Sequence, residues 1–167
     1  MIVVSDTTPL ITLMKAGKLS ILHGLFGEVM IPEAVFSELT SNETFKDEAD
    51  IIRSSAYTKV VKVRDGRQVS FLQRATGLDL GESEAIIYAD EEKADLLLID
   101  EAAGRKVAQN MKLPITGSVG ILIKAFQSGI ITAEEADDAL YRVRRANRHI
   151  SEKLINKALS IIHSKAE

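Results

Sequence analysis

The chain has 167 residues, of which 46% are hydrophobic, and it contains three histidines and no cysteine. This length is typical of one globular domain that buries roughly 70% of the surface of its unfolded chain. The absence of cysteine excludes a disulfide framework and thiolate metal sites, so a metal ion would need oxygen ligands or the few histidines. Met1 leads directly into a strand pattern, and no apolar run approaches the ~20 residues that span a bilayer, so we expect a cytoplasmic protein without a membrane segment.

The net charge of −3 hides a basic C-terminal segment. Residues 142–165 contain seven Lys or Arg and one acid, which gives this segment a charge of +6 and leaves −9 on the rest of the chain. A basic segment on an acidic body indicates contact with a polyanion or with an acidic partner. A solvated helix face explains the same charges equally well, so charge alone leaves both interpretations open.

The first eleven residues, M-I-V-V-S-D-T-T-P-L-I, have the pattern of a buried strand that leads into a helix. The apolar run ends at Asp6, which therefore lies at the C-terminal end of a strand. Thr7, Thr8 and Pro9 then form a favourable start for a helix. In open α/β sheets, this edge is where ligands bind.

The predicted elements after residue 11 alternate between helices and strands. Strands are predicted at 28–31, 57–63, 94–99 and 113–116, and helices at 18–24, 32–39, 64–76, 80–89, 102–111, 118–129, 132–145 and 151–163, with one more around 49–52. This alternation predicts an α/β fold with a parallel sheet.

Glu38 occupies an unusual position in the predicted helix 32–39. By helical spacing it shares a face with Ala34 and Val35, which are packing residues. This spacing predicts a carboxylate directed toward the sheet. The alternative is that Glu38 marks the solvated edge of the apolar stripe.

The position of Glu82 also allows two interpretations, a carboxylate directed inward or a helix cap. It shares a helix face with the small residues Ala85 and Ala89, whereas Glu84 points roughly 200° away at ~100° per residue. Glu82 would then face inward at the start of its helix. The alternative is structural, with Asp79 as N-cap and Glu82 reaching back to it in a capping box.

A second buried strand, at 94–99, also ends at an acid, Asp100, which is followed by Glu101. Two such acids at one sheet edge, with Glu38 and Glu82 on inward helix faces, would repel one another strongly. Such a cluster is stable if some carboxyl groups are protonated or if a divalent cation neutralises them. Mg²⁺ or Mn²⁺ held by carboxylates and water supports hydrolysis of a phosphodiester, which indicates nuclease chemistry.

Competing α/β chemistries lack their motifs in this chain. The sequence contains no G-x-G-x-x-G dinucleotide fingerprint, no G-x-x-x-x-G-K-[ST] phosphate loop and no G-x-S-x-G nucleophile elbow. A phosphatase with an aspartyl nucleophile would need D-x-D, whereas Thr8 stands two residues after Asp6.

Four segments together resemble the PIN-domain family, most closely a prokaryotic branch of it. They are V-V-S-D-T-T-P-L-I at 3–11, I-P-E-A-V-F-S-E-L at 31–39, L-G-E-S-E-A-I at 80–86 and L-L-I-D-E-A-A-G-R at 97–105. The resemblance covers about residues 1–145. It implies a three-layer α/β/α sandwich with a central parallel sheet of about five strands, and a Mg²⁺- or Mn²⁺-dependent ribonuclease that cleaves RNA.

The resemblance also implies roles for individual residues. The acidic quartet that serves catalysis and metal binding in the family is matched by Asp6, Glu38, Glu82 and Asp100. Thr8 matches a hydroxyl that usually supports the first Asp. Glu82 stands where Asp is frequent, and the additional Glu101 is either a further ligand or a charge at a helix N-terminus. Arg105 matches the branch as a residue that contacts phosphate or caps the acids.

The resemblance further implies partners and a domain organisation. We expect a single PIN-like domain over residues 1–167, with a basic helical C-terminal extension at about 142–167. VapC-type members are toxins inhibited by a cognate antitoxin, and the family implies a homodimer or higher oligomer. RNA phosphates are the expected contacts of Arg142, Arg144, Arg145 and Arg148, with an acidic partner as the alternative. The alternative function is a non-catalytic module with a PIN fold that binds nucleic acid or protein.

Overall fold

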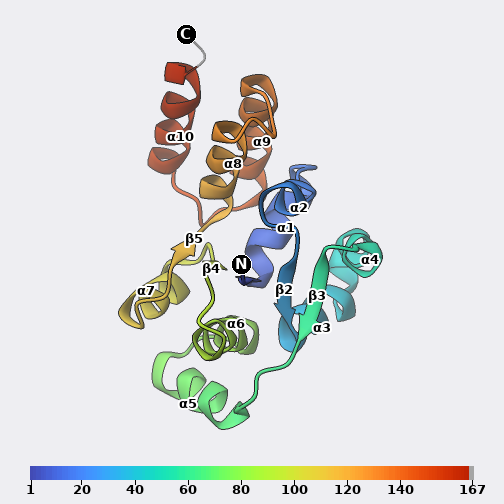
Figure 1. The fold of residues 1–167 in the computed structure, drawn as a ribbon, viewed down its shortest axis with the longest axis vertical. Helices are drawn as coiled ribbons and strands as arrows, with labels where there is room; N and C mark the ends of the chain where they lie inside the picture. Colours follow the sequence, from blue (N-terminus) through green and yellow to red (C-terminus); the bar gives the residue numbers. More distant parts are fainter. Residues whose placement is uncertain (166–167) are drawn as a thin grey trace.

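The computed structural model describes residues 1–165 and contains a five-stranded, fully parallel sheet with helices on both faces (Figure 1). The strands are β1 (Val3–Ser5), β2 (Val29–Pro32), β3 (Thr58–Val61), β4 (Leu96–Leu98) and β5 (Ile115–Thr116). The helices are α1 (Thr7–Lys15), α2 (Ile21–Phe26), α3 (Glu33–Ser41), the 3₁₀ turn η1 (Glu43–Phe45), α4 (Lys46–Ser54), α5 (Gly66–Thr76), α6 (Leu80–Glu91), α7 (Ala102–Asn110), α8 (Ser118–Gln127), α9 (Ala133–Ala146) and α10 (Glu152–Lys165). The expected three-layer α/β/α sandwich is therefore confirmed.

The sheet has the strand order β3-β2-β1-β4-β5, so β1 lies at its centre. The chain builds outward from β1 to β3 and then returns to the other side of β1 to form β4 and β5. The pair of Ser5 with Leu98 places the C-terminal ends of β1 and β4 next to each other. This reversal of strand order is the position at which open α/β sheets bind their ligands.

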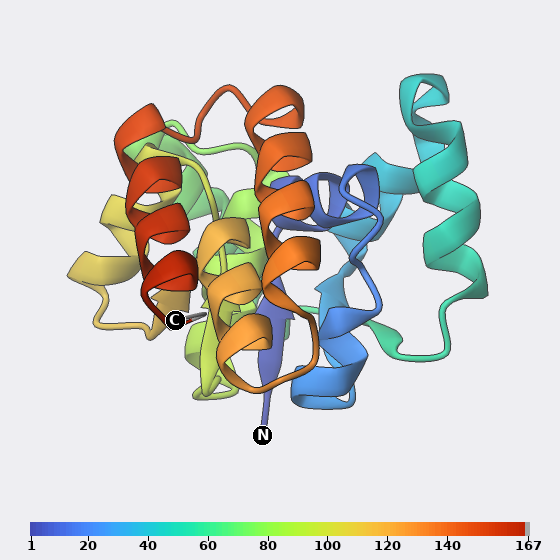
Figure 2. The ribbon, with the colours of Figure 1, turned by 90° about the horizontal axis from the view of Figure 1, so that it is seen from above.

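Successive residues of β1 point to opposite faces of the sheet and supply two separate cores. Val3 packs in the larger core, which is formed with α1, α2, α8, α9 and α10. Val4 packs in the smaller core with Leu97 and with Ile86 of α6. Figures 1 and 2 show α8, α9 and α10 side by side on one face, and Figure 1 shows α5 and α6 on the other. Both faces of β1 are thus fully covered, which explains its uninterrupted apolar sequence.

The basic C-terminal extension is an integral part of the larger core. α10 packs against α8 and α9 through Ile155, Ala158 and Ile162, which are buried. The helical spacing of Leu154, Ala158, Ile161 and Ile162 predicts that these residues face inward. This is wrong for Leu154, which is 42% exposed, because the buried face begins one residue later, at Ile155. Residues 166–167 of the expected extension lie outside the described part of the chain.

Two other predicted boundaries need correction. Pro32 ends β2 and caps α3, rather than occupying the first helical position. The helix expected at 18–24 is Ile21–Phe26, and residues 19–20 form a turn before it. Within residues 1–165, no helix is long and apolar enough to cross a membrane.

Candidate active site

Asp6 lies at the end of β1 and forms the N-cap of α1. Its backbone N–H donates to the carbonyl oxygen of Leu98 over 3.0 Å, which fastens it to the neighbouring end of β4. The residue is only 2% exposed, yet its carboxylate makes no capping hydrogen bond to α1. The carboxylate of Asp6 is therefore buried at the edge of the sheet, beside the start of α1.

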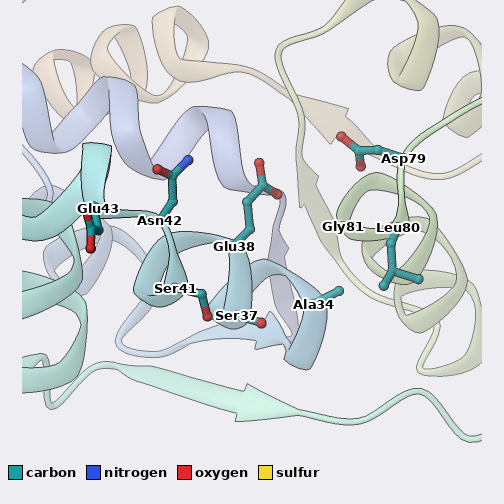
Figure 3. A pocket seen from close by; sticks show the side chains of 9 residues that line it. All are labelled: Ala34, Ser37, Glu38, Ser41, Asn42, Glu43, Asp79, Leu80 and Gly81. Carbon is teal, nitrogen blue, oxygen red and sulfur yellow. The ribbon is translucent and has the colours of Figure 1, made fainter.

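Glu38 of α3 faces the start of α1. The hydroxyl of Thr7 donates to Oε2 of Glu38 over 2.8 Å. A groove of about 680 Å³ opens beside this pair, between α3 and the start of α6, with Asp79 on its other side (Figure 3). The lining residues that are not acidic include Ser37 and Leu80. Glu38 thus lies where an elongated ligand could approach from solvent.

Glu82 combines the two roles that the sequence left open. Its Oε2 accepts from the backbone N–H of Asp79 over 3.3 Å, while Oδ1 of Asp79 accepts from the backbone N–H of Glu82 over 2.8 Å, so the capping box is complete. Its Oε1 is buried and has no hydrogen-bond partner. One carboxylate oxygen therefore stabilises the helix, and the other faces the site.

Two glycines permit the acids to lie this close to the backbone. A Cβ atom added at Gly81 would lie 3.1 Å from Oε2 of Glu38, and one added at Gly104 would lie 2.9 Å from Oε1 of Glu82. A side chain at Gly81 would displace the carboxylate of Glu38, and one at Gly104 would collide with Cδ1 of Ile99, 2.5 Å away, as well as with Glu82. The glycines of the L-G-E and A-G-R segments thus make room for the acidic cluster.

Glu84 points away from this cluster, as the helix phase predicts. Its Oε2 accepts from the backbone N–H of Ala34 over 2.8 Å, in the first turn of α3. A carboxylate at a helix N-terminus satisfies a free N–H and interacts favourably with the helix dipole. Glu84 therefore ties α6 to α3, and this link holds Glu38 and Glu82 in register.

Asp100 follows β4 on the other side of Asp6 and is held by several donors. Its Oδ1 accepts from the backbone N–H of Ser118 over 2.7 Å, and its Oδ2 accepts from the hydroxyl of Ser118 and, over 3.1 Å, from Nδ2 of Asn147. Nη1 of Arg105 donates to the carbonyl oxygen of Ile99 over 2.8 Å. Asp100 thus occupies a more polar environment than Asp6.

Glu101 lies close to Asp100 and also to Glu38 and Glu82. Its Oε1 accepts from the hydroxyl of Thr8 over 3.2 Å and lies 3.8 Å from Nε2 of His149. The structure here differs from the expectation that Thr8 supports Asp6. Consecutive residues of a helix point about 100° apart, so Thr7 reaches Glu38 and Thr8 reaches Glu101.

The carboxyl groups of the site hold their protons more tightly than usual. Burial raises the pKa of Asp6 well above its ordinary value; a hydrogen bond from the backbone N–H of Thr7 opposes this shift, and the negative charges of Glu82, Asp79 and Glu38 add to it. Burial, followed by the charge of Asp79, raises the pKa of Glu82 to about 7. Burial also raises the pKa of Glu38 and that of Asp100, although hydrogen bonds from Ser118 oppose the latter shift. Asp6, Glu38, Asp79 and Glu82 therefore form one electrostatically coupled group.

A comparison with protein-family models identifies the fold. A model described as a PIN domain matches residues 2–164. The chain belongs to the PIN-domain family. Searches of curated proteins and of solved structures each found no significant match. PIN domains are generally nucleases that use divalent metal ions.

The fit of a metal ion to this PIN domain depends on the acids around the start of α1. Within residues 1–165, no three acidic or histidine side chains are already close enough together to hold one ion. The donor set nevertheless suits a hard cation, because carboxylate oxygens are the ligands that Mg²⁺ and Mn²⁺ prefer. Oε1 of Glu82, which is buried without a partner, is the kind of group that a bound cation would satisfy. Asp6, Glu38 and Glu82 therefore fit the ion, with Asp100 beside them.

The basic residues near this PIN site fall into two groups. Arg142 and Arg144 pair with Asp138 over 2.9 Å and with Glu152 over 2.7 Å, respectively. By contrast, a hollow of about 290 Å³ that includes Thr8 is lined by Arg145, Arg148 and His149. Arg145 and Arg148 thus line a hollow beside Thr8, the hydrogen-bond partner of Glu101, whereas the other two arginines already neutralise acids of α9 and α10.

Sequence reasoning missed four residues of the site. Asp79 was considered only as a cap, although its charge acts on the other acids. Thr7 and Ser118 stand directly after sheet strands, which is a signal that could have revealed them. Asn147 gave no such signal, because it lies 47 residues from Asp100 and follows a long helix.

The raised pKa of Glu82 predicts how the metal-free protein responds to pH. The ordinary pKa of this carboxyl is 4.5, and the folded protein raises it to about 7, so between these values the folded state binds a proton that the unfolded state has lost. The free energy of unfolding is therefore expected to fall as pH rises from about 4.5 to 7. Chemical denaturation in EDTA across this range measures the slope. Glu82→Gln should flatten it, and an unchanged slope would contradict the assignment.

Proposed function

We propose that the protein is a divalent-metal-dependent ribonuclease that hydrolyses phosphodiester bonds of RNA. The observation that supports this most directly is the group of carboxylates at the carboxyl end of β1, in which Asp6 and Glu82 are buried, one oxygen of Glu82 is unpartnered and Glu38 is open to solvent. Such a group is stable in its charged form when a cation neutralises it. The groove beside Glu38 gives a substrate access to this position.

The residues of the site have separate tasks in this mechanism. Mg²⁺ or Mn²⁺, when bound, lowers the pKa of a water molecule and stabilises negative charge on phosphoryl oxygens. Asp6, Glu38 and Glu82 would hold the ion, and Asp100 would act beside them. The hydroxyl of Thr7 orients the carboxylate of Glu38, so that its other oxygen, Oε1, is available to the ion.

Cleavage of RNA by the purified protein tests the proposal. We expect cleavage in Mg²⁺ or Mn²⁺ and none in EDTA, and we expect Glu38→Gln to reduce the rate on the order of 10²-fold. Glu33→Gln, which alters an exposed acid of the same helix, should retain the parent rate. A folded parent protein that binds RNA but never cleaves it would instead indicate a non-catalytic PIN module.

Arg145 and Arg148 are proposed to contact the phosphates of the RNA, since they line the hollow beside Thr8. Phosphate contacts release counterions, so RNA binding should weaken steeply with salt. Replacing both residues by Gln should flatten the slope of log K against log salt by about 1–2 units. The matched control replaces Arg142 and Arg144, whose paired charges should contribute less. Fluorescence anisotropy of labelled RNA in EDTA gives both slopes, and a larger change in the control pair would reverse the assignment.

A role as the toxin of a toxin–antitoxin pair is proposed on the family resemblance alone, as is assembly into a homodimer or higher oligomer. Growth arrest on expression, relieved by the product of an adjacent small gene, would support the first proposal. A monomeric mass in solution would contradict the second.

A further inference from the structure

Asn147 lies where the chain turns from α9 to α10, and it is buried with 4% exposure. Its Nδ2 donates to Oδ2 of Asp100 over 3.1 Å and to the hydroxyl oxygen of Thr12 over 3.1 Å. Its Oδ1 accepts from the backbone N–H of His149 over 3.0 Å. A buried amide with three partners has a single favourable orientation. Asn147 therefore connects three segments that are distant in the sequence.

The contact with Asp100 involves one of the acids of the candidate metal site. The other hydrogen bonds to this carboxylate come from Ser118, at the start of α8. Asn147 adds a donor from the junction of α9 and α10, 47 residues from Asp100, and it carries no charge. It thus orients the carboxylate without neutralising it. Arg105 acts on Asp100 through its charge, which lowers the pKa of that carboxyl, while its Nη1 donates to the carbonyl oxygen of Ile99.

We propose that Asn147 is a positioning residue that holds Asp100 in the orientation in which its carboxylate serves the metal site. The α9–α10 junction would then be a working part of that site as well as of the apolar core. This inference rests on the proposed function, because Asp100 is assigned to the metal site only by that proposal. Groups that hydrogen-bond to metal ligands typically change metal affinity by about 10–100-fold when they are replaced.

The test measures Mn²⁺ affinity from the electron paramagnetic resonance signal of free Mn²⁺, and needs no activity. Asn147→Ala should raise the dissociation constant about tenfold. Thr12→Val is the matched control, because it removes the other acceptor of Nδ2 and leaves the contact with Asp100 in place. It should bind Mn²⁺ with the affinity of the parent. Should Asn147→Ala lose its near-ultraviolet circular dichroism, the smaller change Asn147→Ser takes its place.

A double mutant distinguishes a positioning role of Asn147 from a general effect on stability. If Asn147 acts through Asp100, adding Asn147→Ala to Asp100→Asn should weaken Mn²⁺ binding no further than Asp100→Asn alone. Additive losses would overturn the proposal, as would parent-like affinity in Asn147→Ala or equal losses in Thr12→Val. A folded parent protein that binds no Mn²⁺ would refute the proposed metal-dependent function itself. Binding in the parent with no effect at Asn147 would refute the positioning role alone.

Discussion

Glu82→Gln is expected to reduce metal-dependent RNA cleavage on the order of 10²-fold or more, whereas Glu84→Gln should leave most of it. The reason is geometric, since Oε1 of Glu82 faces the site while Oε2 of Glu84 caps α3. Loss of a metal ligand removes several kcal/mol of charge stabilisation in the transition state, and each ~1.4 kcal/mol is tenfold in rate.

Glu84→Gln is a demanding control, because the two residues lie on the same turn of α6 and the change is chemically identical. Gln can still accept a hydrogen bond from Ala34, so α3 should stay in place at a cost of about 0.3–1 kcal/mol. Initial rates in Mn²⁺ give the comparison. The opposite ranking would show that Glu84 carries the metal chemistry and that the capping box of Glu82 is purely structural.

Asp6→Asn is expected to stabilise the metal-free protein at pH 7 and to abolish its stabilisation by Mn²⁺. Burial and neighbouring acids oppose the charge of Asp6, so a neutral side chain of the same shape removes that penalty. We expect a gain of about 1 kcal/mol, or roughly 2–4 °C in Tm. For the parent, Mn²⁺ at about 100 times its Kd should add about 2.7 kcal/mol.

Thermal melts of the parent and the variant, each in EDTA and in Mn²⁺, measure both effects. Because a raised folded pKa makes stability fall as pH rises, the advantage of Asn over Asp should grow from pH 5 to pH 7. Equal Mn²⁺ shifts in the two proteins would remove Asp6 from the metal site. A less stable variant in EDTA would show that its carboxylate is not repelled in the folded state.

Much of the fold follows from local patterns in the sequence. The apolar runs around Val3 and Leu97 predict strands buried on both faces, and the Asp79 and Thr132 caps fix where α6 and α9 begin. Predictions of buried residues were wrong where the apolar pattern fits two adjacent residues equally well. Leu154 and Ile155 are both apolar, and only packing against α8 and α9 decides which of them is buried.

The candidate site was predictable to a smaller extent. Acids that end strands or share a helix face with small residues could be identified, as Asp6 and Glu82 show. Which hydroxyl reaches which acid depends on the packing of α1 against α3 and against the start of α7, which no local pattern contains, and so the partner of Thr8 was missed. The sequence could not show which arginines are paired with acids, for the same reason. Glu152, the partner of Arg144, follows a turn whose path is defined only by the fold.

The position of Asn147 has a consequence for protein synthesis. A ribosome completes the four acids of the predicted quartet by residue 100, but the amide that binds Asp100 emerges 47 residues later. A nascent chain that ends after β5 therefore possesses all the carboxylates of the quartet but lacks the donors of Ser118 and Asn147 to Asp100 and the helices α8, α9 and α10 that cover the larger core. Assembly of the Asp100 side of the site is thus delayed until the fold around it is nearly finished, which would separate the synthesis of the acids from the onset of the proposed RNA cleavage.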